Sequence, residues 1–287
     1  MQAKSLCFPV RSPDPRSEYT SYVFRLTREV RFAVNRSSDD QLTSRPSNSF
    51  GGYPALTGAG QYFVLQVTLA GELEERTSYL LNIKQVDEAV RNKVIPLVTE
   101  LIRSNRFGGG APAASGAFEM LRDAFGSVSL ESVTLRLTPL LAYEARRREL
   151  PMVRLSQTFE FSASHRLHNA ELSDDENRRK FGKCNNPHGH GHNYEVQVTL
   201  AGEPDQSAGV LIDVPAMERI VSSTVIDRFD HKNLNVETEE FRDLIPSVEN
   251  IAMVIFRMLK PQFERQRARL ASVTVWETPK TWCEYSE

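Results

Sequence analysis

Three histidines in the second half of the chain have the spacing of a metal site. His190-Gly191-His192 opens a stretch of alternating apolar residues that predicts a β-strand. Residues i and i+2 of a strand project to the same face, so both imidazoles can converge on one ion. His165 ends the preceding predicted strand, where a hairpin partner would lie alongside. Three imidazoles with a fourth position left open are typical of catalytic zinc.

The ligand set has alternatives at this stage. His188 precedes the pair by two positions and could replace His192 in a pair with His190. Cys184, in the turn-like segment Gly182-Lys-Cys-Asn-Asn-Pro187, could be a fourth ligand, since thiolates also suit zinc. Beside a dication and Lys183, the same thiol is expected to be held as a thiolate, which could act as base or nucleophile. His168 lies in a polar loop and is expected to be solvated.

A second pair of polar residues follows a predicted helix. Asp230-His231 stands in the sequence Arg-Phe-Asp-His-Lys-Asn-Leu-Asn235. An aspartate that holds one imidazole nitrogen raises the basicity of the other, which is how a proton relay is built. Taken alone, the pair also fits a polar turn that ends a helix.

Composition limits what kind of protein this is. The chain has 287 residues with 35 basic and 37 acidic side chains, a formal charge of −2. This balance argues against a nucleic-acid partner, which calls for a clustered positive excess. No apolar run approaches the ~20 residues that span a bilayer, so no membrane partner is expected. Three cysteines in a chain of this length predict a reducing compartment, here the cytoplasm, and the proline-bearing residues 1–20 predict a disordered tail rather than a secretion signal.

An internal repeat divides the chain. Gln-Val-Thr-Leu-Ala-Gly-Glu occurs at 66–72 and again at 197–203, an offset of 131, and shorter matches follow on both sides. The sequence therefore predicts two copies of one unit of ~130 residues, 21–145 and 151–287, joined around Arg146 to Pro151.

Each copy is expected to be an α+β layer of order ββααββ, an antiparallel sheet with helices on one face. In the second copy the strands are predicted over 153–161, 194–200, 272–277 and 282–285, and the apolar stripes of two helices start at Met217 and Val248, with Ser247 as N-cap. In the first copy a long helix over 86–102 is expected to kink at Pro96, and a short helix over 118–125 to follow a flexible Gly108-Gly109-Gly110 loop.

Five ordered motifs of the second copy carry a resemblance to a known family. They are Phe161-Ser-Ala-Ser-His-Arg-Leu167, the run from Phe181 to Tyr194, Asp230-His-Lys-Asn-Leu-Asn235, Glu249-Asn250 and Val275-Trp-Glu-Thr278. Together they resemble the 6-pyruvoyl-tetrahydropterin synthases. The resemblance implies the tunnelling fold, whose units oligomerise through their sheets into barrels with active sites between subunits. It also implies elimination of triphosphate from 7,8-dihydroneopterin triphosphate.

The resemblance further implies roles for single residues. Zinc would be held by His165, His190 and His192, with His188 outside the set. Cys184 would be the proton-abstracting base, and Asp230 and His231 its relay partners, lent by a neighbouring subunit. Glu277 would anchor the pterin, with Ser247 and Glu249 also at the substrate, although relatives often carry threonines around 247–248.

The first copy lacks this chemistry. At the offset of 131, His190 and His192 align with Ala59 and Gln61, while His165 aligns with about Asn35 and Glu277 with Leu137. This copy is therefore expected to serve as scaffold, supplying sheet edges and subunit contacts.

Three other functions fit the same residues. A 6-carboxy-tetrahydropterin synthase of the queuosine route would use the same substrate, but such relatives usually have a shorter gap than the six positions from Cys184 to His190. A zinc hydrolase would use the three histidines to generate hydroxide and would not need Cys184. A non-catalytic pterin-binding protein would need Glu277 but neither zinc nor Cys184.

Overall fold

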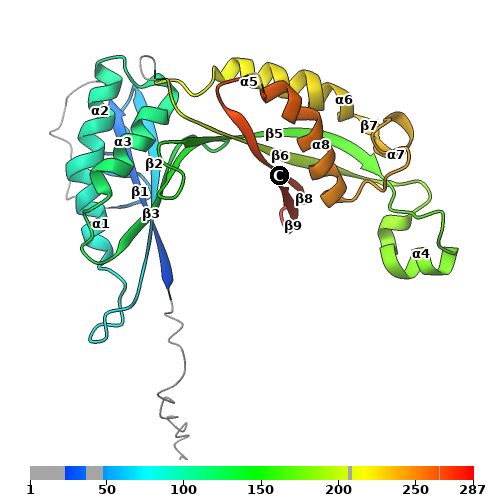
Figure 1. The fold of residues 1–287 in the computed structure, drawn as a ribbon, viewed down its shortest axis with the longest axis horizontal. Coiled ribbons are helices and arrows are strands. Elements are labelled where there is room, and N and C mark those ends of the chain that lie inside the picture. The colour runs from blue at the N-terminus through cyan, green and yellow to red at the C-terminus, as the bar shows by residue number, and fades with distance from the viewer. Residues whose placement is uncertain (1–22, 37–47, 206–208, 265) are drawn as a thin grey trace, which may run out of the picture.

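The computed structural model describes residues 23–36, 48–205, 209–264 and 266–287. The tail predicted over residues 1–20 lies outside these ranges. Within them the chain forms a mixed α+β structure in which antiparallel strands make one large sheet and the helices pack on it (Figure 1). The predicted fold class is confirmed.

The first half contains the predicted order of two strands, helices and two strands. Its elements are β1 (Phe24–Asn35), β2 (Gly60–Gly71), α1 (Ile83–Ala89), a π-helical segment (Val90–Val94), α2 (Ile95–Arg103), a 3-10 turn (Gly108–Gly110), α3 (Ala111–Leu121), β3 (Ser129–Thr138) and β4 (Leu141–Arg146).

The expectation for the second helix of the first half, and for the glycine loop before it, is wrong. The glycines form a 3-10 turn, and α3 begins directly after them at Ala111 and ends at Leu121, not at Phe125. The sequence there is rich in alanine, the best helix former, with Pro112 in the first turn, where proline is tolerated. The long helix expected over 86–102 is present as one helical run through α1, the π-helical segment Val90–Val94 and α2, with Pro96 in the first turn of α2.

The second half repeats the order and adds elements that were not predicted. Its elements are β5 (Val153–His165), α4 (Asp174–Phe181), a 3-10 turn (Gly182–Asn185), β6 (His190–Gly202), α5 (Val214–Val221), a π-helical segment (Ser222–Ile226), α6 (Asp227–Phe229), β7 (Lys232–Asn233), α7 (Leu234–Glu237), α8 (Val248–Phe263), β8 (Arg269–Thr278) and β9 (Thr281–Tyr285). The additions are α4, β7 and α7. As predicted, Ser247 caps α8, its Oγ accepting from the N–H of Asn250.

One sheet runs through both halves. Its order in the described residues is β1-β2-β3-β4-β5-β6-β8-β9, every neighbouring pair being antiparallel, and the short β7 adds to β5 in parallel. The connection between the halves, residues 147–152, is a turn between the paired strands β4 and β5. Figure 1 shows α1, α2 and α3 over the strands of the first half and α5, α6 and α8 over those of the second. Apolar side chains of the strands and helices form the core between these layers.

Irregular features recur at matching places in the two halves. A β-bulge interrupts the pairing of β2 with β3 at Thr68/Leu69 and that of β6 with β8 at Thr199/Leu200, an offset of 131 residues. The π-helical segments begin at Val90 and Ser222. Stacked rings join Phe32 to Phe63 in one half and Phe161 to Tyr194 in the other.

The packing of the first helix on the first strand also matches. Arg28 of β1 makes a bidentate ion pair with Asp87 of α1 through its Nε and Nη2, at 2.9 Å each. In the second half, Gln157 of β5 donates to Glu218 of α5. Both contacts join the first strand of a half to its first helix at matching positions. The first half uses two charged groups, whereas the second uses an amide and a carboxylate.

No helix among the described residues is both long and apolar enough to cross a bilayer.

Candidate metal centre and active site

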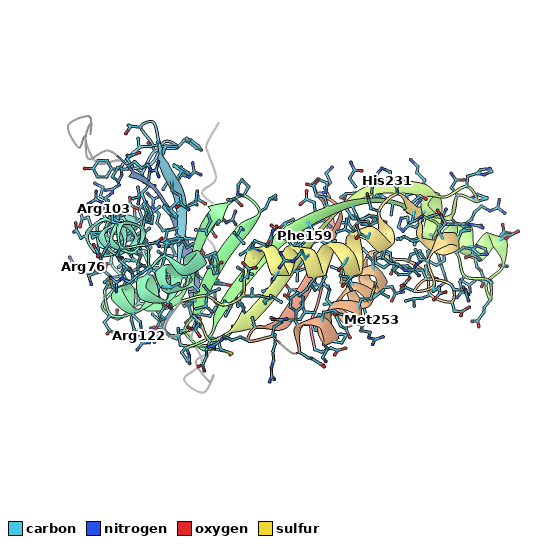
Figure 2. All side chains as sticks on the ribbon, turned by 90° about the horizontal axis from the view of Figure 1, so that it is seen from above. Arg76, Arg103, Arg122, Phe159, His231 and Met253 are labelled. Carbon is cyan, nitrogen blue, oxygen red and sulfur yellow. The ribbon has the colours of Figure 1, made fainter. Side chains whose placement is uncertain are left out.

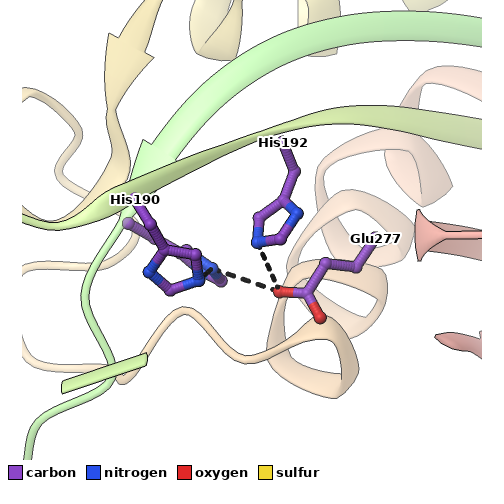
Figure 3. A group of neighbouring side chains, drawn as sticks. His190, His192 and Glu277 are labelled. Atoms are coloured by element: carbon purple, nitrogen blue, oxygen red, sulfur yellow. Dashed lines mark hydrogen bonds and ion pairs between the residues drawn. The ribbon is translucent and has the colours of Figure 1, made fainter. Parts of the chain in front are cut away.

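The three histidines predicted as ligands lie together at the end of the β5–β6 hairpin. His165 and His190 are directly opposite each other in the antiparallel register, and His192 follows two residues later on the same face. The Nε2 atoms of His165 and His190 are 3.0 Å apart. Figure 3 shows His190 and His192 reaching from β6 toward the carboxylate of Glu277.

The ring of His165 is held in one orientation by the main chain before α8. The side chain is fully buried, and its Nδ1 lies 2.7 Å from the carbonyl oxygen of Pro246. A carbonyl can only accept, so Nδ1 carries the proton and donates it, and in the neutral ring the lone pair on Nε2 points into the cluster. A second partner of this kind is typical of a metal-ligating histidine, because it fixes the tautomer.

Glu277 of β8 completes the cluster. Its Oε1 lies 3.1 Å from Nε2 of His165 and 3.3 Å from Nε2 of His192. The contact with His165 holds the pKa of Glu277 below its ordinary value, with the neighbouring histidines adding to the effect and burial opposing it. The residue is therefore a carboxylate, a group that suits both a metal and a bidentate hydrogen-bond donor.

The donor set fits a metal ion. Ring nitrogens of the three histidines and a carboxylate oxygen of Glu277 all lie within 4.8 Å of one another. Burial lowers the pKa of His190 and of His192, so both rings are kept in the neutral form that ligates metals. Among the described residues, His190 Nδ1 and His192 Nε2 are buried without a hydrogen-bond partner. Acceptor atoms turned toward one another at about 3 Å repel unless a proton or a cation lies between them.

Cys184 lies on the 3-10 turn that follows α4, near enough to Glu277 for that charge to act on its thiol. Its carbonyl oxygen accepts from the N–H of Leu167, which ties the turn to the segment after β5. Burial raises the pKa of the Cys184 thiol, and the negative charge of Glu277 raises it further. The protein's own side chains thus favour the thiol, and the exposed Lys183 does not offset them. The expected thiolate therefore depends on the positive charge of a bound ion.

Asp230 and His231 form the predicted pair, and His231 borders the same surface hollow as His192. Asp230 Oδ2 lies 2.8 Å from Nδ1 of His231, and its Oδ1 accepts from the N–H of Ser162 on β5. The hydrogen bond from Ser162 and then that from His231 lower the pKa of Asp230. The His231 side chain is 83% exposed and lies at the surface (Figure 2). The described residues show no contact between this pair and Cys184 or the three histidines.

Ser247 and Glu249, the other two residues expected at the substrate, lie at the start of α8. Ser247 follows Pro246, the residue that orients His165, and its hydroxyl is used as the cap of α8. Glu249 is exposed in the first turn of α8, and its charge acts on Cys283 of β9. Neither carboxylate nor hydroxyl has a described contact with the metal-binding cluster.

The remaining histidines are outside the cluster. His188 is exposed, and its N–H donates to the side chain of Asn186. His168 is not simply solvated, because its Nδ1 lies 3.0 Å from Oδ1 of the buried Asn185. Sequence reasoning missed Asn185, Pro246 and Tyr194, which support the site without bearing its chemistry. The available signal was that Phe161 and Tyr194 are aromatic and share the strand faces of the histidines, and in the structure their rings stack.

The positions of the first half that match the metal-binding cluster carry neither histidine nor a carboxylate. The register puts Ala59 and Gln61 opposite the end of β1, and the N–H of Arg36 donates to Ala59. Because Phe32 matches Phe161, the counterpart of His165 is Arg36, one residue beyond the expected Asn35. Leu137 stands in the place of Glu277, as expected from the sequence.

The fold and the site together define an α+β enzyme-like scaffold with a histidine and carboxylate cluster able to hold a metal. A family model, 6-pyruvoyl tetrahydropterin synthase, matches residues 154–287. A putative 6-pyruvoyl tetrahydrobiopterin synthase of Caenorhabditis elegans is 42% identical over 131 residues, 46% of this chain and 92% of the relative. The chain therefore belongs to the 6-pyruvoyl tetrahydropterin synthase family, a family of lyases.

Two further proteins are similar to the second half of this chain. The solved structure of Caenorhabditis elegans 6-pyruvoyl tetrahydropterin synthase is 40% identical and covers 48% of this chain and 98% of its own, with a TM-score of 0.46. A 6-carboxy-5,6,7,8-tetrahydropterin synthase of Haemophilus influenzae is 28% identical over 156 aligned positions, 47% of this chain and all of the relative.

Proposed function

We propose that this chain is a zinc-dependent lyase that converts 7,8-dihydroneopterin triphosphate into 6-pyruvoyl-tetrahydropterin by eliminating triphosphate. The observation that carries the proposal is the convergence of His165, His190 and His192 with Glu277, whose charge acts on the thiol of Cys184. Family membership supplies the reaction class, and the donor set supports the metal. Three neutral imidazoles with room for a further ligand are the usual protein contribution to catalytic zinc.

The histidines would hold zinc, which supplies Lewis-acid polarisation of side-chain oxygens of the substrate. The chain's own groups then move protons. Cys184, as thiolate, takes a proton from the carbon next to the polarised oxygen, and the hydrogens are redistributed within the substrate. No external redox cofactor is needed, because the oxidation of the side chain and the reduction of the pterin ring balance.

Glu277 serves as the pterin anchor in this proposal. It is ionised and buried to 17% exposure, as the bidentate acceptor of the 2-amino group and N3–H of a pterin must be. Ser247 and Glu249 stand at the start of α8, directly after the Pro246 that orients His165, and are proposed to border the substrate. Because its carboxylate also reaches the histidines, Glu277 links the position of the pterin ring to that of the metal.

Asp230 and His231 are proposed to act in the active site of a neighbouring subunit. Asp230 holds Nδ1 of His231 and leaves Nε2 free, so the pair has the form of a proton relay. The exposure of His231, with no described hydrogen bond or ion pair to Cys184, supports a role across a subunit contact. The proposed enzyme is accordingly a homo-oligomer.

We also propose that the two halves are tandem copies of one unit and that the first has kept only its scaffold role. The shared heptapeptide, the bulges, the π-helical segments and the aromatic stacks at matching positions support this.

Product analysis tests the proposed reaction. Purified protein loaded with zinc is incubated with 7,8-dihydroneopterin triphosphate, and the products are separated and identified. The proposal predicts triphosphate and 6-pyruvoyl-tetrahydropterin, with no acetaldehyde. Acetaldehyde and 6-carboxy-tetrahydropterin would instead place the chain with the 6-carboxy synthases, and unchanged substrate at full zinc loading would indicate a binding protein. His168→Ala is the matched control, because this histidine is outside the metal cluster.

A further inference from the structure

The residue after the proposed metal ligand His165 is bonded to two other parts of the site. The side chain of Asn235 binds both main-chain groups of Arg166, its Oδ1 accepting from the N–H at 2.7 Å and its Nδ2 donating to the C=O at 3.0 Å. These bonds extend the pairing of β5 with β7 beyond the strand residues themselves. The end of β5 is therefore fixed to the segment that carries Asp230 and His231.

The side chain of Arg166 is bonded to the turn that carries Cys184. Its Nε donates to the main-chain carbonyl oxygen and to Oδ1 of Asn185, at 3.2 Å each. The N–H of the next residue, Leu167, donates to the carbonyl oxygen of Cys184 at 2.9 Å. Two neighbouring residues at the strand end thus hold two neighbouring carbonyl groups of the turn.

The turn has few other ties to the rest of the chain. It is a 3-10 segment, Gly182–Asn185, in which Asn185 is the buried residue. Among the described residues, its remaining hydrogen bonds stay within 178–189, except that Nδ1 of His168 lies 3.0 Å from Oδ1 of Asn185. The place of the turn relative to the histidine cluster is therefore set by the strand end at 166–168.

The charge of Arg166 does not act on the thiol. Burial and the charge of Glu277 raise the pKa of Cys184, and the guanidinium does not oppose them. Any influence of Arg166 on Cys184 is therefore exerted through the position of the turn.

We infer that Arg166 is a positioning residue, which sets the distance from the Cys184 thiol to the metal by holding Asn185 against the strand end that carries His165. The inference rests on the proposed function, in which the ion keeps this thiol as a thiolate. The consecutive residues 165–167 then serve the ion, Asn185 and Cys184 in turn. A displacement of about 1 Å between reacting groups can cost about 100-fold in rate.

Two substitutions of Arg166 separate its hydrogen bonds from its bulk and charge. In Arg166→Met a methyl group takes the place of Nε and donates nothing, whereas Arg166→Gln keeps a neutral N–H donor close to that place. With zinc bound, Arg166→Met should lower kcat by about 10- to 100-fold and change KM by less than about 3-fold. The kcat of Arg166→Gln should exceed that of Arg166→Met by at least about 5-fold, because the donor is kept.

The pH profile of thiol alkylation gives a readout besides turnover. Iodoacetamide is applied to the zinc-loaded full-length chain at a series of pH values, and peptide mass spectrometry follows Cys184, with Cys283 as the reference thiol. Because only the thiolate reacts, the midpoint reports the influence of the ion, and the plateau at high pH reports access to the thiol. Arg166→Met should move the Cys184 midpoint to higher pH, with stoichiometric zinc and an unchanged Cys283 midpoint.

Three further variants grade the effect. Asn185→Ala removes Oδ1 but keeps the bond from Arg166 to the carbonyl, so its kcat and midpoint should fall between those of Arg166→Met and the wild type. His168→Ala removes only the second contact of Oδ1, and Arg179→Met makes the same substitution at an exposed position of α4. Both of these controls should match the wild type.

An unmoved midpoint with a raised plateau in Arg166→Met would show that the side chain only shields the thiol, and would overturn the inference. So would equal kcat values for the Met and Gln variants. If Arg166→Met does not fold, Asn185→Ala decides by the same midpoint. A shifted midpoint without product from the wild type would refute the proposed reaction and leave this inference intact, whereas product with an unmoved midpoint would do the reverse.

Discussion

The two halves of the sheet have matching frames, yet only the second has a group that could hold a metal within the described residues. Where the second half has His190, His192 and Glu277, the first has Ala59, Gln61 and Leu137. The bulges, the π-helical segments and the ring stacks are present in both. The frame is therefore specified by the core and by strand register, while the chemistry is specified by a few side chains at one end of a hairpin.

The largest expected effect comes from giving the second half the residues of the first. His190→Ala combined with His192→Gln removes two of three imidazoles, so stoichiometric zinc and turnover should both be lost, the latter by about 10³-fold or more. Metal content per chain and product formation measure this. The reciprocal change, Ala59→His with Gln61→His, should gain no metal because Arg36 and Leu137 offer no ligand atoms. Metal bound at wild-type level by the first variant would contradict the assigned ligands.

Removing the first half should be nearly as damaging. A fragment of residues 151–287 loses β4, which exposes Val153 and Leu155, now fully buried, along an open strand edge. We expect an aggregated or inactive fragment in size-exclusion chromatography and the product assay. A soluble fragment with full activity would show that the first half has no scaffold role.

The thiol is the next difference between the halves. Cys184→Ala should lower turnover by about 10²–10⁴-fold, the usual contribution of a positioned acid or base, while zinc remains bound. Cys283→Ala is the matched control, since this thiol lies on β9 and not at the cluster. Steady-state rates with metal analysis decide the outcome, and unchanged turnover in Cys184→Ala would favour the zinc-hydroxide mechanism of a hydrolase.

The smallest expected effect concerns the junction between the halves. A hydrogen bond from Arg154 holds the pKa of Glu149 below its ordinary value. A lowered folded-state pKa stabilises the fold above the unfolded-state pKa, and this is lost as pH falls through the folded-state value. Glu149→Gln should thus lower the free energy of unfolding by about 1 kcal/mol at neutral pH and by almost nothing near pH 3. Urea unfolding at both pH values measures this, and an equal loss at both would exclude the ion pair as the cause.

Much of the frame could be predicted from the sequence, because alternation and helical stripes report directly on burial. The strands of the second half and the helices starting near Met217 and Val248 are where the periodicity placed them. The helix at Ala111–Leu121 was misplaced, since a run of small residues after three glycines has little periodic signal. The short elements α4, β7 and α7 depend on polar contacts that no hydrophobic pattern marks.

The site was predictable in its residue types but not in its contacts. His-x-His on a strand, with a histidine ending the neighbouring strand, is a local pattern whose geometry follows from pleating. The carbonyl of Pro246 that orients His165 is 81 residues away in the chain, and a main-chain acceptor has no sequence signature. The raised pKa of Cys184 was also missed, because it results from burial and from Glu277, which only folding brings near.

The turn of residues 147–152 bears on how the protein assembles. It links β4 to β5 so closely that each half meets the other at an effective concentration in the millimolar range, whatever the amount of protein in solution. The junction between the two halves therefore forms within one chain during folding. Dilution cannot separate this junction, because the covalent turn keeps β4 and β5 together at any protein concentration.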